Sequence, residues 1–160
     1  MSNKFSFNKS LTKEEAYSQL LPQIRALVEG EVDLIANLAN ISAVLKESFG
    51  WWWVGFYFVR ETELVLGPFQ GPIACTRIAF GKGVCGHAWK QKQSIMVDDV
   101  NLYEGHIACS SSSQSEIVIP IMKNNEVIAL LDIDSENWAQ FDTIDKKYLE
   151  ELSRGIALLF

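Results

Sequence analysis

The sequence predicts an α+β fold in which helices pack on a mainly antiparallel sheet of six strands. Apolar residues repeat at helical spacing near both ends of the chain, and runs of aromatic and β-branched residues fill its middle. The connections between these runs are short, which suits antiparallel neighbours and not parallel crossovers. With 160 residues, 48% of them hydrophobic, residues 1–160 are expected to form a single domain with its own core.

Two helices are expected before the sheet and one after it. A capping-box pattern opens the first helix, predicted at residues 12–28. The second is predicted at residues 32–49 and should end at Gly50, because glycine accepts the left-handed conformation of a helix end. The closing helix is expected at residues 143–159. The apolar stripe of the second helix is predicted to be Ile35, Leu38, Ile41 and Leu45.

Strand-like segments follow the second helix. The run at residues 51–60 is almost wholly aromatic or β-branched, which is typical of a strand buried on both faces. Residues 98–114 form a long irregular segment, a length typical of functional or disordered loops. The six strands are predicted at 51–60, 63–68, 74–80, 94–97, 116–122 and 127–133, with a short helix at 84–91.

Charge and composition exclude several classes of partner. The net charge of −6 argues against nucleic acids and anionic membranes, which both need a basic surface. The sequence has neither a signal-peptide pattern nor an apolar run long enough to span a membrane, so a cytoplasmic location is expected. The three cysteines should then be reduced, and they are either buried apolar fillers or working thiols.

A glycine-rich motif at residues 81–86 (GKGVCG) matches the dinucleotide fingerprint in its letters. That fingerprint needs a parallel strand–helix–strand unit, whereas the sheet here is predicted to be antiparallel. A turn that delivers Cys85 to a helix N-terminus explains the motif better. The cysteines and the two histidines, His87 and His106, lack metal-ligand spacing, so no metal site is predicted, and a zinc site assembled in space is the alternative. His106 either influences the thiol of Cys109 or is a hydrogen-bonded loop histidine.

Three acidic residues interrupt the last two strands. Asp132 and Asp134 are two positions apart and face the same side of a sheet, either as a site or as a strand end in water. With a regular two-residue turn at residues 124–125, Glu116 pairs with Ile133 and faces away from them. A longer loop or a bulge near Pro120 places Glu116 opposite Asp134. A shared carboxylate site therefore predicts an irregular hairpin.

Five segments resemble the free methionine-(R)-sulfoxide reductases, a GAF-domain family. They are residues 66–75 (LGPFQGPIAC), 83–86 (GVCG), 105–109 (GHIAC), 115–118 (SEIV) and 131–135 (LDIDS). The similarity extends from the second helix to the last one. It implies a GAF-like fold for this chain, with an N-terminal helical region at about 1–30 and a core at 31–160. His87 and Trp89 stand where smaller residues are expected, which would alter the rim of the cavity.

The resemblance also implies roles for individual residues. Cys109 corresponds to the nucleophile that attacks the sulfoxide sulfur, Cys75 to the resolving thiol and Cys85 to an accessory thiol. The other site residues implied are the substrate-site acids Glu116, Asp132 and Asp134 and the aromatic pocket walls Trp53 and Tyr57. Without the resemblance, Cys85 would be preferred as the nucleophile, because a helix N-terminus lowers a thiol pKa.

The implied activity is the reduction of free methionine sulfoxide to methionine. A cysteine sulfenic acid and an intramolecular disulfide would form, and a thioredoxin-like donor would reduce the disulfide without any cofactor. A homodimer through the N-terminal helices is compatible with the sequence. The alternative is a GAF module that binds a small ligand or senses redox state without turnover, and a metal- or haem-binding sensor is a weaker one.

Overall fold

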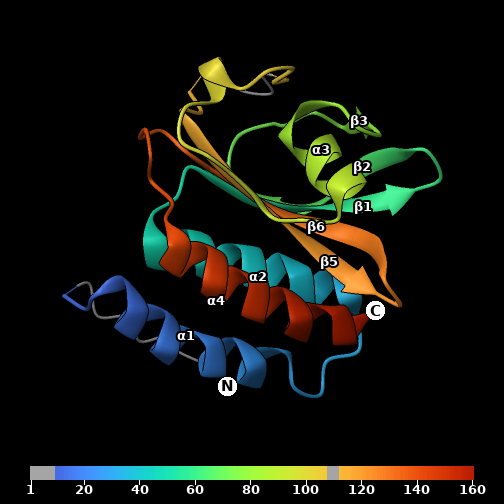
Figure 1. Cartoon of the computed structure of the whole chain (residues 1–160). Coiled ribbons are helices and arrows are strands. Elements are labelled where there is room, and N and C mark those ends of the chain that lie inside the picture. Colours follow the sequence, from blue (N-terminus) through green and yellow to red (C-terminus); the bar gives the residue numbers. More distant parts are fainter. Residues whose placement is uncertain (1–9, 108–111) are drawn as a thin grey trace.

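The computed structural model describes residues 10–107 and 112–160 as a six-stranded sheet with helices on both faces (Figure 1). The strand order is β3-β2-β1-β6-β5-β4, and each neighbouring pair is antiparallel. The predicted α+β class and the six strands are therefore confirmed. The strands are β1 (Trp53–Arg60), β2 (Glu63–Gln70), β3 (Arg77–Ala79), β4 (Ile95–Val97), β5 (Ser115–Lys123) and β6 (Glu126–Ser135).

One face of the sheet is covered by α2 (Leu34–Phe49) and α4 (Thr143–Ile156), with α1 (Lys13–Val28) packed outside them (Figure 1). The predicted capping box of α1 is present at Thr12, and Asp142 caps α4 in the same way. Asp145 of α4 is buried and accepts hydrogen bonds from Tyr17 (2.7 Å) and Lys13 (2.5 Å), which joins α1 to α4. Short 3-10 turns lie at Val100–Leu102 and Ala157–Leu159.

The predicted stripe of α2 is wrong at its first residue. Ile35 is 53% exposed, whereas Leu38, Ile41 and Leu45 are buried in the core. The helix begins only at Leu34, and the Asp33 carboxylate caps it by accepting a hydrogen bond from the Ala36 amide. Ile35 therefore lies in the first turn of the helix and is not packed into the core. No helix among the described residues is long and apolar enough to cross a membrane.

The other face of the sheet is covered by α3 (Gly83–Gln91) (Figure 1), and Val100 and Tyr103 from the chain after β4 pack into the core on this face. Side chains of β1 alternate between the two faces. Val54, Phe56 and Phe58 join the core under α2 and α4, and Trp53 and Tyr57 join the smaller core under α3. The prediction that β1 is buried on both faces is thus confirmed.

The hairpin between β5 and β6 is irregular, and this decides which side chains share a face. Asn124 and Asn125 have positive φ, as a tight two-residue turn requires. Next to the turn Met122 pairs with Val127, but Ile121 pairs with Ala129, so β6 contains one extra residue. The bulge was expected near Pro120, and the register shift lies beside that residue, between Ile121 and Met122, with the extra residue at position 128 of β6.

Candidate active site

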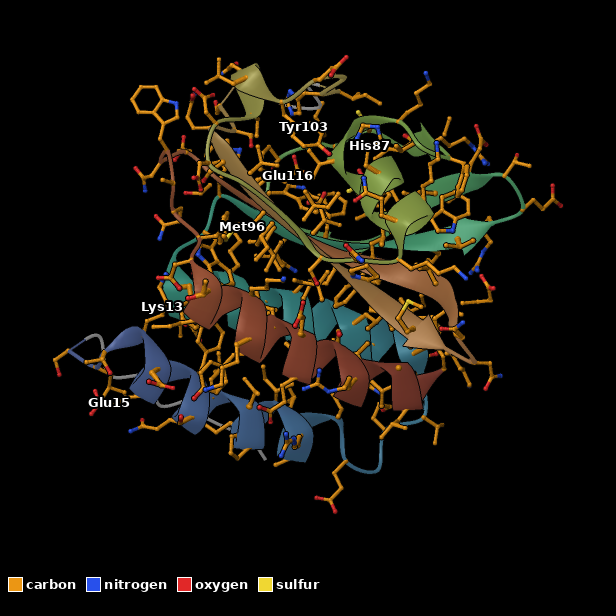
Figure 2. All side chains as sticks on the ribbon, in the orientation of Figure 1. Lys13, Glu15, His87, Met96, Tyr103 and Glu116 are labelled. Carbon is orange, nitrogen blue, oxygen red and sulfur yellow. The ribbon has the colours of Figure 1, made fainter. Side chains whose placement is uncertain are left out.

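The bulge brings the three predicted acids onto the face beneath α3. After the shift in register, Glu116 lies directly opposite Asp134, and Val118 lies opposite Asp132. Without the extra residue, Glu116 would oppose Ile133 and point towards the other core. Figure 2 shows Glu116 on the side of the sheet that α3 covers. The non-ideal hairpin that a shared carboxylate site requires is therefore present.

A pocket of about 50 Å³ lies between this face, α3 and the segment before β5. Its described lining includes the three acids, Cys85 at the start of α3, and His106 and Ser113 from the segment before β5. None of the described residues that line it is a lysine or an arginine. Negative charge here must consequently be neutralised by bound protons or by a cationic ligand. The aromatic side chains in the lining are Trp52, Trp53 and Tyr57.

The three carboxyl groups all have raised pKa values. Burial raises the pKa of Glu116 and of Asp132 well above the usual range, and the neighbouring carboxylates raise both further. Burial also raises the pKa of Asp134 to about 6. A hydrogen bond from the Ser113 hydroxyl, 2.5 Å from Asp134 Oδ1, opposes that rise because it stabilises the charged form. Protons are therefore held in this pocket near neutral pH.

Trp53 and Tyr57 form one wall of the pocket, as their spacing on β1 predicts. Their ring centroids are 6.1 Å apart, and Trp53 Nε1 donates a hydrogen bond to the Pro72 carbonyl at 3.1 Å. Between them on the strand is Gly55, opposite Asp132. A Cβ atom at Gly55 would come within 2.4 Å of the Trp53 ring, so only glycine lets the indole lie across the sheet here.

The cysteines differ in their surroundings. Cys85 is free and buried, and its Sγ donates to Glu116 Oε1 at 3.9 Å. Burial, together with the nearby Asp132 and Glu116, raises the pKa of the Cys85 thiol. The expectation of a lowered pKa at the helix N-terminus is thus wrong, because desolvation and negative neighbours outweigh the helix dipole.

Cys75 is partly buried and disulfide-bonded, whereas reduced thiols were expected from the sequence. Its backbone carbonyl accepts a hydrogen bond from the Tyr57 hydroxyl at 2.8 Å, so the pocket wall and this cysteine are joined directly. Burial raises the pKa of Tyr57, which keeps the hydroxyl protonated as a donor. Cys109, the third predicted thiol, lies outside the described residues.

The two histidines have different places. His106 lines the pocket with its Nε2 3.9 Å from Glu116 Oε2, and burial lowers its pKa. His87 Nδ1 lies 2.9 Å from the Tyr103 hydroxyl, and both residues line a neighbouring hollow (Figure 2). Trp89 packs edge-on against Phe80. Neither His87 nor Trp89 is among the described residues that line the pocket, and their effect on its rim stays a prediction.

The glycine-rich motif at residues 81–86 forms the turn that leads into α3. The Gly81 amide donates to the Gly86 carbonyl at 3.1 Å, and a Cβ atom at Gly86 would lie 2.7 Å from the Ala79 carbonyl oxygen. Close backbone packing thus explains the motif, which places Cys85 in the pocket. Sequence reasoning missed the contacts of Ser113 and Trp52 with the pocket, since neither shows a distinctive spacing.

Comparison with known proteins identifies the family. The family model for the GAF domain matches residues 31–160. GAF domain-containing protein A of Dictyostelium discoideum is 58% identical over 142 residues, covering 88% of this chain and 90% of that protein. Free methionine-R-sulfoxide reductase of Escherichia coli (strain K12) is 45% identical over 143 residues, covering 89% of this chain and 87% of the relative.

A solved structure agrees with these matches. The X-ray structure of free methionine-R-sulfoxide reductase from Neisseria meningitidis in complex with its substrate is 52% identical to this chain. The two superpose with a TM-score of 0.95, over 98% of this chain and 94% of the other. The predicted resemblance and the GAF-like fold are confirmed. This chain belongs to the GAF-domain family of free methionine-R-sulfoxide reductases.

Proposed function

We propose that this chain is an oxidoreductase that reduces free methionine-R-sulfoxide to methionine with its own thiols. The observation that carries the proposal is the acidic pocket, in which Glu116, Asp132 and Asp134 meet without a lysine or arginine among the described lining. Such a pocket suits a small cationic group beside an oxygen that must accept a proton. A free amino acid sulfoxide has both.

The α-ammonium of the substrate is the cation that these acids are proposed to bind. Asp132 is 6% exposed, and no described residue donates a hydrogen bond to its Oδ1. A buried oxygen without a partner is costly, and an ammonium would supply the missing donor. A peptide offers an uncharged amide nitrogen in its place, so the site should select the free amino acid. Trp53 and Tyr57 would pack against the apolar part of the substrate.

The reduction needs a proton on the sulfoxide oxygen and a thiolate at its sulfur. We assign the proton donors as Glu116 and Asp134, whose raised pKa values keep protons available near neutral pH. The Cys109 thiolate attacks the sulfur, and the protonated oxygen then passes from that sulfur to the Cys109 sulfur as methionine leaves, so that Cys109 becomes a sulfenic acid. The Cys75 thiol condenses with it, releasing water and forming a disulfide.

Two features support this assignment of the thiols. Cys75 is disulfide-bonded next to the pocket, whereas Cys85 is free, buried and surrounded by acids that disfavour its thiolate. Cys85 is therefore proposed as an accessory group and not as the nucleophile. A thioredoxin-like protein in the cytoplasm would reduce the disulfide by exchange, with no cofactor in the cycle.

Thioredoxin-coupled NADPH oxidation tests the proposed function. The assay compares free methionine-R-sulfoxide, the S epimer and a peptide-bound sulfoxide. Turnover is expected for the free R epimer and loss of turnover for the peptide. Asp132→Asn should raise KM, because the ammonium loses its charged partner, and exposed Asp98→Asn should not. Binding of the free amino acid without turnover would instead favour the non-catalytic GAF module.

A further inference from the structure

Three side chains of the pocket form a cluster with the composition of a metal site. Cys85 Sγ and one carboxylate oxygen each of Glu116 and Asp132 lie within 4.8 Å of one another, and all three residues are buried. They come from three separate elements, α3, β5 and β6, so their convergence follows from the fold and not from a local sequence motif.

A second observation points to a missing ligand at the same place. One carboxylate oxygen of Asp132 belongs to this cluster, and the buried Oδ1 of the same carboxyl group has no hydrogen-bond partner among the described residues. Polar atoms buried this deeply are nearly always paired. The described lining of the pocket contains no lysine or arginine that could fill this position.

The donor set selects the kind of ion. A thiolate with two carboxylate oxygens is too soft for Mg²⁺ or Ca²⁺, which take oxygen ligands, and it suits Zn²⁺ in tetrahedral geometry. Zinc–ligand bonds of 2.0–2.3 Å place neighbouring donors about 3.5 Å apart. The donor atoms, within 4.8 Å of one another, would have to approach by roughly 1 Å at the widest separation. His106 Nε2, 3.9 Å from Glu116 Oε2, is a candidate fourth donor, with water as the alternative.

We infer that Cys85, Glu116 and Asp132 form a Zn²⁺ site in the pocket, and that the ion and the amino acid substrate exclude each other. Binding replaces the proton on the Cys85 sulfur and any proton shared by the two carboxyl groups with the ion. No electron transfer is involved. The pocket of about 50 Å³ holds an ion with a bound water, so the site needs no large rearrangement. The exclusion rests on the proposed function, because both occupants are assigned to Asp132.

Co²⁺ provides a spectroscopic test, since a cobalt–thiolate bond gives a charge-transfer absorption band. The disulfide form of the full chain is used, so that Cys85 is the free thiol that can bind Co²⁺ and give the absorption band. One equivalent of Co²⁺ should produce the band, and Zn²⁺ should abolish it by displacement. Cys85→Ala should remove the band and weaken Zn²⁺ binding by at least about 100-fold, and Asp132→Asn should weaken it roughly 10- to 100-fold. Exposed Glu47→Gln is the matched control and should bind as the wild type does.

Circular dichroism and thermal unfolding establish that each variant is folded before it is titrated. A band that persists in folded Cys85→Ala, or wild-type protein that binds neither ion at one equivalent, would overturn the proposed site. Exclusion is measured on the double variant Cys75→Ser/Cys109→Ser, which cannot turn over. Free methionine sulfoxide should bleach the cobalt band, and a band that survives saturating substrate would overturn the exclusion. Reductase activity without any cobalt band would leave the proposed function standing and refute only the metal site.

Discussion

Replacing Asp134 by asparagine is expected to change how stability depends on pH. The pKa of Asp134 is about 6 in the folded protein, against 3.8 for the unfolded group. The folded state therefore binds this proton more tightly than the unfolded chain does. The contribution of the bound proton to stability is complete below about pH 4 and is lost as the pH rises through 6. By linkage, the ionised group costs about 3 kcal/mol of folding free energy at pH 8.

Asp134→Asn removes that cost, because the amide stays neutral at every pH. The variant should exceed the wild type in free energy of unfolding by about 3 kcal/mol at pH 8, and the difference should shrink towards pH 4. Interaction with the neighbouring acids should not reduce this gain in stability. The Asp134 charge also raises the pKa values of Glu116 and Asp132, so removing it relieves both groups as well. Urea denaturation from pH 4 to pH 8 measures the difference, with exposed Asp98→Asn as the control.

All other titrating groups are common to the wild type and the variant, so the difference between the two curves isolates the pocket. Parallel curves from pH 4 to pH 8 would refute the reasoning, as would a variant that gains stability only at acid pH. Parallel curves would mean that Asp134 ionises in the folded protein as readily as in the unfolded chain, and a gain confined to acid pH would mean that it ionises more readily.

Three further substitutions test the pocket. Ser113→Ala removes the hydrogen bond that lowers the pKa of Asp134, so the alkaline limb of the pH profile of kcat/KM should move to higher pH. Gly55→Ala places a Cβ atom 2.4 Å from the Trp53 ring and should cost about 1–3 kcal/mol in urea denaturation. Glu116→Gln should lower kcat/KM roughly 100- to 10,000-fold in the coupled assay without lowering the free energy of unfolding.

Two of these predictions have a matched control. Gly155→Ala lies in α4 with no atom within 4 Å of the added Cβ, and it should stabilise the protein by about 0.5–1 kcal/mol. If Gly55→Ala were equally harmless, the close contact would not exist. Glu47→Gln should leave kcat/KM unchanged. A Glu116→Gln variant with wild-type kcat/KM, or an unmoved alkaline limb in Ser113→Ala, would contradict the proposed proton donors.

The pattern of the sequence predicted the sheet and its helices well, because long periodic runs and strong caps determine them locally. The second helix and the first strand were each expected to begin two residues too early, and for the helix the Asp33 cap sets the boundary. Ile35 shows the limit of periodicity: it fits the apolar stripe, yet it is exposed because the helix begins just before it.

The convergence of the three acids depends on the register of the hairpin between β5 and β6, which the sequence limits to two possibilities but does not decide. Both registers of the last hairpin were compatible with its turn residues, and the bulge at residue 128 selects the one that joins Glu116 to Asp134. The pKa of Cys85 could not be predicted, because its burial and its acidic neighbours come from other elements of the fold. The hydrogen bond from Ser113 is equally non-local.

Single-turnover release of methionine tests the central claim most directly. Fully reduced protein is mixed with free methionine-R-sulfoxide in the absence of any reductant, and methionine is quantified. One methionine per chain is expected for the wild type and for Cys75→Ser, and none for Cys109→Ser. Release of one methionine per chain by Cys109→Ser would contradict the assignment of Cys109 as the nucleophile. The assignment would fail most clearly if Cys85→Ala released none while Cys109→Ser still released one.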